Sequence, residues 1–294
     1  MAAGPTTSTA STDRMQVFTT AAELQAWSDG HRIAGRRVGV VPTMGALHDG
    51  HMALVTEARR RADVVVVTIF VNPLQFNRPD DFATYPRPID DDLEHCRRHG
   101  VDAVYAPVAA SMYPEGFQTH VVPGSLADVL EGAERPGHFR GVTTVVTKLF
   151  NAARPHVAVF GQKDFQQLAI IRRMALDLDT GIEIIGLPTV READGLAMSS
   201  RNRRLTAAQR EAAVCVPRSL DAVAHAFHSG EVDPAELVRL GRALVDAEPM
   251  ARFEHLELVD ADTLEHVAAA HPRCVAVTAV WFGDVRLIDN QLLG

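Results

Sequence analysis

The stretch Val38-Gly-Val-Val-Pro-Thr-Met-Gly-Ala-Leu-His-Asp-Gly-His51 decides how the rest of the chain is interpreted. An apolar run ends at Pro42, and two glycines and two histidines follow it. Residues 52–62 then have the spacing of an amphipathic helix. A strand, a glycine-containing turn and a helix start in this order predict a site for a phosphate chain. The physical reason is that the first N–H groups of a helix have no intrahelical partner and attract anions.

The two histidines of this stretch allow several interpretations. His48 and His51 share one face of the first helical turn, where imidazole N–H groups would stabilise charge on a phosphoryl group. A pair of solvated side chains and a zinc site are the alternatives. Zinc is disfavoured, because a zincin motif needs His-Glu-x-x-His on one helix and no third ligand is obvious. We expect Asp49 or Gly50 to cap the helix.

Composition and charge argue against several classes of protein. The chain has 294 residues, of which 47% are hydrophobic and 22% charged, and its formal net charge is −8. This acidic balance argues against a general nucleic-acid surface. No run approaches the ~20 apolar residues of a membrane span. The cysteines are odd in number and far apart, which argues against a disulfide framework and favours a reducing compartment. We expect each to be a small buried side chain: Cys96, Cys215 and Cys274.

The chain is expected to divide into a tail and two domains. Residues 1–13 are small and polar and lack the parts of a secretion signal, so they predict a disordered tail. Strand and helix patterns alternate over residues 14–188, which predicts a doubly wound parallel sheet with helices on both faces. Residues 189–294 begin with a charged, hydroxyl-rich segment. Helices and alternating strands follow it, which predicts a smaller α+β domain.

Hydrophobic periodicity places the individual elements. Strands are expected at residues 15–19, 37–41, 63–71, 101–106, 156–160, 182–185, 253–260 and 274–288. Helices are expected at residues 21–31, 52–62, 90–99, 142–153, 161–178, 207–228 and 234–247. Residues 77–88 are expected to form a surface loop, and residues 126–140 an irregular segment. We expect Thr20 to cap the first of these helices and Gly283-Asp284 to form a hairpin turn.

Two further motifs add basic and hydroxyl groups. Gly161-Gln-Lys-Asp164 follows an apolar run, and Lys163 would act there as a point charge on phosphates. Met198-Ser-Ser-Arg-Asn-Arg-Arg204 supplies hydroxyls and guanidinium forks in a segment that can close over a nucleotide. A solvated lysine and a charged surface loop are the alternative interpretations.

Acidic and amide residues complete the set of candidates. Asp90-Asp-Asp92 can hold Mg²⁺ directly or through water. An equal alternative is that the three solvated acids only begin a helix, where their charge matches the helix dipole. Gln75 and Gln167 each follow a strand end. A buried glutamine amide can bind a substrate hydroxyl or carboxylate, whereas most glutamines are simply exposed.

Together these motifs resemble the pantothenate synthetase family, the pantoate–β-alanine ligases. The family is part of the nucleotidyltransferase superfamily that has the His-x-Gly-His motif. This motif alone would indicate only that superfamily. The similar stretches run in family order over about residues 15–205, and as an ordered set they are specific: 42–51, 70–76, 85–87, 135–139, 161–164 with Gln167, and 198–202. The resemblance implies a Rossmann-like domain followed by a smaller C-terminal one.

The resemblance also implies an activity. This is the ATP-dependent condensation of (R)-pantoate with β-alanine, which gives pantothenate, AMP and pyrophosphate through a pantoyl-adenylate. It implies Mg²⁺, for which Asp91 and Asp92 are our candidate ligands, and a cytoplasmic homodimer. ATP, pantoate and β-alanine would be the partners, with no nucleic acid and no membrane.

The motifs carry over to individual residues. The implied catalytic residues are His48, His51, Lys163, Ser199, Ser200 and Arg201. The implied ATP site comprises Pro42, Thr43, Met44, His48, His51, Phe160, Gly161, Lys163, Asp164, Val190, Met198, Ser199, Ser200 and Arg201. The implied pantoate site comprises Met44, Asn72, Gln75, Tyr85, Arg135 and Gln167.

The chain departs from the family pattern at three places. Gln162 replaces the acidic residue usual before the lysine, Phe165 replaces a common tyrosine, and residues 77–79 lack the usual glycine. None of these changes removes a proposed catalytic group. A nucleotidyltransferase acting on a phosphorylated acceptor and a non-catalytic nucleotide sensor are the competing hypotheses. Release of AMP only in the presence of an amine would distinguish the ligase from both.

Overall fold

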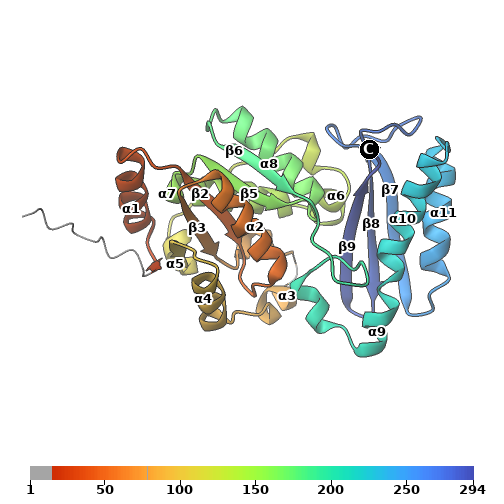
Figure 1. Cartoon of the computed structure of the whole chain (residues 1–294), viewed down its shortest axis with the longest axis horizontal. Helices are drawn as coiled ribbons and strands as arrows, with labels where there is room; N and C mark the ends of the chain where they lie inside the picture. Colours follow the sequence, from red (N-terminus) through yellow and green to blue (C-terminus); the bar gives the residue numbers. More distant parts are fainter. Residues whose placement is uncertain (1–14, 78) are drawn as a thin grey trace, which may run out of the picture.

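A six-stranded parallel sheet forms the centre of the first part of the chain (Figure 1). The computed structural model describes residues 15–77 and 79–294. The predicted tail at residues 1–13 and position 78 of the predicted loop therefore lie outside the described residues. The strand order is β1-β4-β3-β2-β5-β6, with β1 (Gln16–Phe18), β2 (Val38–Thr43), β3 (Val64–Ile69), β4 (Ala103–Tyr105), β5 (Val157–Gly161) and β6 (Glu183–Leu187).

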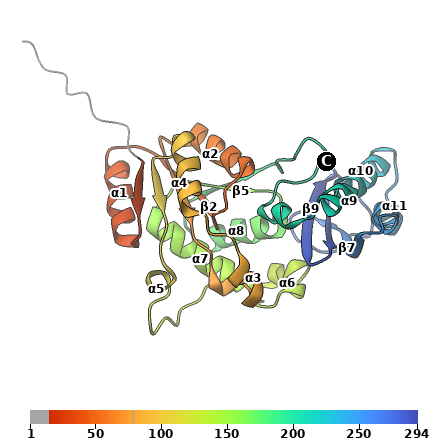
Figure 2. The same cartoon turned by 90° about the horizontal axis from the view of Figure 1, so that it is seen from below.

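Helices cover both faces of this sheet, which confirms the predicted doubly wound, Rossmann-like arrangement (Figure 2). Strand β3 is buried along its whole length, as a β-branched strand covered on both faces must be. One face packs against α1 (Ala21–Ile33), α7 (His138–Ala153) and α8 (Phe165–Asp177). The other packs against α2 (Asp49–Arg61) and α4 (Ile89–Arg98).

The strand order reverses beside β2. Strands β3 and β4 follow on one side of β2, whereas β5 and β6 lie on the other. In open α/β sheets, ligands bind outside the carboxyl ends of the strands at such a switch point. Strand β2 ends at Thr43 and β5 at Gly161, so the histidine motif and the Lys163 motif begin at the same edge of the sheet.

Several short elements differ from expectation. The predicted loop at residues 77–88 contains helix α3 (Pro79–Thr84). The single helix expected at residues 207–228 is divided into α9 (Ala207–Ala212) and α10 (Cys215–His228). Pro217 explains the division, because it has no N–H to continue a helix and is tolerated only in a first turn. The remaining short helices are α5 (Ala109–Met112), α6 (Glu131–Glu134), η1 (Pro73–Gln75), η2 (Ser125–Ala127) and η3 (Ser200–Arg204).

The C-terminal part is a three-stranded antiparallel sheet with helices on one face, which confirms the predicted α+β arrangement (Figure 1). The predicted hairpin turn is present, with Gly283 at φ 61°. The opposite side of the sheet meets the first part of the chain in a shared apolar cluster that includes Leu130, Phe165 and Val275. The elements are β7 (Ala251–Asp260), β8 (Cys274–Phe282), β9 (Val285–Leu292), α10 and α11 (Pro234–Asp246).

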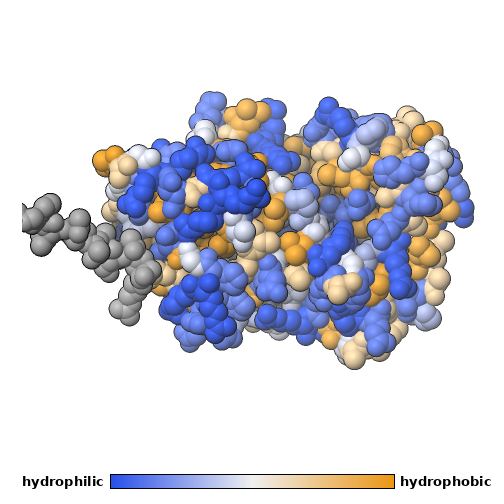
Figure 3. All heavy atoms as spheres, viewed as in Figure 1, coloured by the Kyte–Doolittle hydropathy of each residue, from blue (hydrophilic) through white to orange (hydrophobic). Residues whose placement is uncertain are grey.

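The visible surface is mostly polar. In Figure 3, hydrophilic residues gather over α2 and α4, and hydrophobic residues form smaller groups between them. Among the residues that the structure describes, no helix combines the length and the apolar character needed to cross a bilayer.

Candidate active site

A cavity of about 220 Å³ lies at the carboxyl ends of β2 and β5, where the strand order reverses. Every residue expected to contact ATP lines it: Pro42, Thr43, Met44, His48, His51, Phe160, Gly161, Lys163, Asp164, Val190, Met198, Ser199, Ser200 and Arg201. Four of the six residues expected around pantoate line it as well: Met44, Gln75, Tyr85 and Gln167. Chain topology therefore gathers these distant motifs around one space.

Helix α2 begins at Asp49, three residues earlier than expected, and His48 is its N-cap. The backbone of His48 is extended, and its carbonyl accepts from the N–H groups of His51 (2.8 Å) and Met52 (3.2 Å). The prediction that Asp49 or Gly50 caps the helix is wrong. Gly50 instead makes room, because a Cβ there would lie 2.9 Å from Cε1 of His48.

The histidine pair is electrically neutral at neutral pH. Burial lowers the pKa of His48 to about 4, and the positive charges of Lys163 and Arg203 lower it further. Burial also lowers the pKa of His51 to about 3. Nδ1 of His51 accepts from the backbone N–H of His48 at 3.3 Å, which places the ring proton on Nε2 as a donor. Nδ1 of His48 is buried without a hydrogen-bond partner among the described residues.

Lys163 and the segment 198–204 supply the basic side of the cavity. Ser199 caps η3, and its Oγ accepts from the backbone N–H of Arg201 at 3.2 Å. Asn202 holds the segment by donating to Glu192 Oε1 (2.9 Å) and to the Ala197 carbonyl (3.0 Å). The segment therefore has a defined conformation at its base while Ser199, Ser200 and Arg201 line the cavity.

Asn72 lies behind the cavity wall and supports Gln75. It is 1% exposed, and its Nδ2 donates to Gln75 Oε1 (2.9 Å) and to the Gly141 carbonyl (3.1 Å). Tyr113 Oη donates to Asn72 Oδ1 at 2.7 Å. The Nε2 of Gln75 donates to Met44 Sδ at 3.3 Å, and an amide nitrogen has a second N–H. Gln75 can therefore offer a positioned donor to a ligand.

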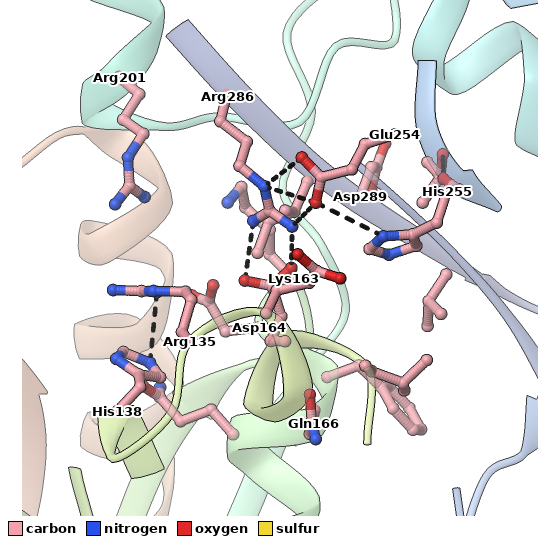
Figure 4. A pocket seen from close by; sticks show the side chains of 18 of the residues that line it. Arg135, His138, Lys163, Asp164, Gln166, Arg201, Glu254, His255, Arg286 and Asp289 are labelled. Atoms are coloured by element: carbon pink, nitrogen blue, oxygen red, sulfur yellow. Dashed lines mark hydrogen bonds and ion pairs between the residues drawn. The ribbon is translucent and has the colours of Figure 1, made fainter. Parts of the chain in front are cut away.

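Arg135 lines a neighbouring cavity instead of the small one. Its Nη2 donates to the Gln75 carbonyl at 3.2 Å, and Nδ1 of His138 approaches the same oxygen at 2.8 Å. Arg135 and His138 also lie in contact with each other (Figure 4). Burial lowers the pKa of His138 to about 4, and the charge of Arg135 acts in the same direction. Both side chains fix the backbone that carries Gln75.

Asp92 holds the histidine turn in place. It is 1% exposed, and its two oxygens accept the backbone N–H groups of Ala46 (2.9 Å) and Leu47 (2.7 Å). Burial raises the pKa of its carboxyl group. Asp91 is exposed, and neither aspartate is among the described residues that line the two cavities. The pair therefore does not fit the Mg²⁺ site that we expected there.

The apolar wall of the small cavity was missed by sequence reasoning. It comes mainly from α7, through Val142, Val145, Val146 and Leu149, and Phe70 and Leu54 also line the cavity. The spacing of the four α7 residues is helical and was visible in the sequence. What the sequence did not show is that this face of the helix borders a cavity as well as the sheet.

A larger cavity of about 530 Å³ adjoins the small one, between the first part of the chain and the C-terminal sheet. The two share Lys163, Asp164, Gln167 and Arg201. Figure 4 shows Arg286 turned toward Glu254 on the C-terminal side. The C-terminal part therefore forms one side of a continuous cleft.

Comparison with known proteins gives consistent matches. A family model described as Pantoate-beta-alanine ligase matches residues 16–292. The pantothenate synthetase of Geotalea uraniireducens (strain Rf4) is 49% identical over 280 residues, covering 95% of this chain and 99% of that relative. Pantothenate synthetase from Thermus thermophilus has a TM-score of 0.89 and 43% identity, covering 95% of this chain and 99% of that chain. Pantoate-beta-alanine ligase from Francisella tularensis, complexed with Beta-gamma ATP and Beta-alanine, has a TM-score of 0.80 and 32% identity, covering 95% and 98%.

Proposed function

We propose roles for the polar groups of the cleft from the premise that this chain belongs to the pantoate-beta-alanine ligase family. The chain condenses pantoate with β-alanine at the expense of ATP, giving pantothenate, AMP and pyrophosphate. One observation supports the assignment of roles above the others. The small cavity brings the histidine pair, Lys163 and the segment 199–201 around one space, with Gln75 and Gln167 on its wall.

The first step joins pantoate to the nucleotide. The pantoate carboxylate is ionised at neutral pH, so it attacks the α-phosphorus of ATP without a general base, and pyrophosphate leaves. Charge that develops on the phosphate oxygens needs donors that are already in place, and losing one such donor typically costs about 10²–10³ in rate. We assign this role to His48, His51, Lys163 and Arg201, with the hydroxyls of Ser199 and Ser200. The histidines act as neutral N–H donors, since burial keeps their pKa values well below neutrality.

Pantoate is held by amides. Gln75 lines the cavity and has a second N–H to donate, and Gln167 lies on the same lining. Asn72 and Arg135 act through Gln75, because one fixes its side chain and the other its carbonyl. This arrangement aligns the carboxylate with the phosphorus, and such alignment contributes a large part of rate enhancement in two-substrate reactions.

Mg²⁺ belongs to the same proposal. Magnesium in ATP-using sites is usually held by one or two carboxylates together with substrate phosphates. Asp164 is the carboxylate among the described residues that line the small cavity, and its side chain is exposed and makes no cap bond to α8. We therefore place the ion with the ATP phosphates beside Asp164. When bound there, it would neutralise phosphate charge.

The second step forms the amide bond. The neutral amine of β-alanine attacks the acyl carbonyl, the C–N bond forms, the C–O bond to AMP breaks with AMP as the leaving group, and the amine loses one proton to water. This chemistry requires no enzyme nucleophile. Closure of the segment 198–204 would protect the acyl-adenylate from water.

An assay of AMP release tests the proposal directly. With ATP, Mg²⁺ and pantoate, the protein should exchange pyrophosphate into ATP but release little AMP until β-alanine is added. His48→Ala should retain the fold and lose most of the exchange. Release of AMP at the full rate without β-alanine would reject the ligase reaction, and wild-type exchange by His48→Ala would reject the role of His48.

We also propose that the chain works as a homodimer in the cytoplasm, as the family resemblance implies. Cys96, Cys215 and Cys274 are free and buried, which suits a reducing compartment. Light scattering of the purified protein measures the oligomeric state. A monomeric mass at working concentration would reject the dimer.

A further inference from the structure

Strand β9 of the C-terminal sheet ends against the turn that carries Lys163. Asn290 of this strand is 7% exposed. Its Nδ2 donates to two consecutive carbonyls of that turn, those of Gln162 and Lys163, each at 2.9 Å. Asn290 lies more than one hundred residues further along the chain than this turn. It thus supplies hydrogen-bond donors to the backbone carbonyls of the phosphate-binding motif.

The turn has few other restraints. Its Gln162 N–H donates to the Leu187 carbonyl at 2.8 Å. Asp164 is the N-cap of α8 but makes no side-chain cap bond. The hydrogen bond that usually fixes the start of a helix is therefore missing here. The lysine side chain is long and flexible, so the position of its backbone decides where the ammonium group can reach.

Asn290 is itself held firmly. The neighbouring Asp289 is 3% exposed, and its Oδ1 accepts the backbone N–H of Asn290 at 2.8 Å. Asp289 also binds Arg191 through two hydrogen bonds, of 2.6 and 3.2 Å. Arg191 donates in turn to the Gly195 carbonyl and bridges to Ala197, at the base of the segment that leads to Ser199. The dipeptide 289–290 therefore contacts both the turn that carries Lys163 and the base of the segment that carries Ser199.

We propose that Asn290 is a positioning residue for the adenylation step, which it serves by fixing the turn that places Lys163 against the ATP phosphates. The proposal rests on the function proposed above. An amide nitrogen suits the task, because it has two N–H donors for two carbonyl acceptors. A carboxylate of the same shape has no donor and would face both carbonyls with negative charge.

The test compares three variants of the full chain in pantoate-dependent ATP–pyrophosphate exchange at varied ATP. Asn290→Asp keeps the shape of the side chain and loses the donors, and Asn290→Ala removes the group without adding charge. Gln291→Ala is the matched control, because this neighbouring side chain bonds only to the carbonyl of Leu292 among the described residues. We expect kcat/KM for ATP to fall about 10- to 100-fold in both Asn290 variants, the scale of a misplaced catalytic group. Gln291→Ala should behave as wild type.

A double-mutant cycle with Lys163→Ala separates positioning from a general structural effect. If Asn290 acts through Lys163, then Asn290→Ala should change exchange by less than about twofold once the lysine is gone. Full additivity of the two losses, or wild-type exchange by Asn290→Ala, would overturn the proposal. Circular dichroism confirms that each variant is folded at the assay temperature. If Asn290→Asp fails to fold, Asn290→Ala still decides the question. Absence of exchange in the wild type would reject the proposed function instead.

Discussion

Gly50 is a residue whose importance depends on the ring beside it. A Cβ at this position would lie 2.9 Å from Cε1 and 3.0 Å from Nδ1 of His48, so the ring would have to move. The backbone tolerates alanine, because the residue lies in the first turn of α2. We expect Gly50→Ala to lower pantoate-dependent pyrophosphate exchange about 10- to 100-fold while the melting temperature stays close to that of the wild type.

The matched control for Gly50→Ala is Gly30→Ala. Gly30 lies within α1 and a Cβ there meets nothing within 4 Å, so this change should leave exchange unaltered and stabilise the fold by about 0.5–1 kcal/mol. If Gly50→Ala exchanged pyrophosphate at the wild-type rate, the position of the His48 ring would not matter for catalysis.

Buried histidines make the fold sensitive to acid. The pKa of His138 is about 4 in the folded chain, against 6.5 for an ordinary histidine. Between about pH 6.5 and pH 4, the His138 imidazole therefore binds a proton in the unfolded chain but not in the folded chain. The contribution to stability is complete above pH 6.5 and is lost as the pH falls toward 4, at up to about 1.4 kcal/mol per pH unit for one group. The free energy of unfolding, measured with urea on either side of pH 6.5, should fall with this slope below pH 6.5 and not above it. His138→Gln should make the slope shallower, and an unchanged slope would contradict the assignment.

The sequence predicted most of the residues around the small cavity but not how they divide their tasks. His48 and Lys163 follow strand ends, so their motifs locate them on one sheet edge, whereas Ser199 was predicted from its hydroxyl-rich motif. Asn72 and Asp92 also belong to recognisable motifs, yet both are buried and bind protein groups. The direction of a side chain depends on tertiary packing, which a motif does not specify.

At the scale of elements, Gly141 allows α7 to approach η1. A Cβ at this position would lie 2.3 Å from the Leu74 carbonyl oxygen and 2.7 Å from the backbone nitrogen of Gln75. Backbone atoms cannot rotate away, so Gly141→Ala must push the two elements apart. We expect a loss of about 1–3 kcal/mol in the free energy of unfolding by urea, the usual range for overpacking. KM for pantoate should rise as well, because Gln75 moves with η1.

Gly124→Ala is the control for the Gly141 prediction. Gly124 has a negative φ and open space around it, so alanine should be neutral there for both stability and KM. A rise in KM for ATP with no change for pantoate would show that η1 does not position the acid substrate.

Long periodic elements were predicted well, whereas short ones were not. The capping box of Thr20 and the buried strand β3 have local signals, and both are present in the structure. Helix α3 has fewer than two turns, so it is too short for a recognisable helical pattern of hydrophobic residues. The division of α9 from α10 has a local signal in Pro217, which our prediction of one helix over residues 207–228 did not use.

At the scale of the whole molecule, the contribution of the C-terminal sheet to the cleft was not foreseeable. Asn290 and Arg286 lie in a strand with an ordinary alternating pattern. Their partners, Lys163 and Glu131, belong to distant parts of the chain. We propose that residues 14–188 and 189–294 form two domains. Such pairs across the boundary can be found only once the domains are packed together.

Arg286 connects the two proposed domains. It binds Glu131 of the first through hydrogen bonds of 2.8 and 2.5 Å, and its Nε donates to Glu254 of the second at 3.0 Å. The three side chains are 16–18% exposed. Breaking a buried ion pair by removing one partner typically costs about 3–5 kcal/mol, because charge is left buried without its partner. We therefore expect Arg286→Ala to lower the free energy of unfolding by about that amount. Arg239→Ala removes an exposed pair with Glu236 in the same domain and should cost less than about 1 kcal/mol.

The two tryptophans show whether this loss also uncouples the domains. Trp27 lies in α1 and Trp281 in β8, so each reports on one domain, and the chain has two tryptophans in all. Urea unfolding is followed by fluorescence in Trp27→Phe and Trp281→Phe backgrounds, each with and without Arg286→Ala. With Arg286 present, the two signals should change at the same urea concentration, because the domains unfold together. With Arg286→Ala, the Trp281 transition should separate from that of Trp27, since the guanidinium no longer joins the carboxylates on the two sides. Coincident transitions and a loss below about 1 kcal/mol would show that the apolar contacts around Leu130, Phe165 and Val275 hold the domains together without this ion pair.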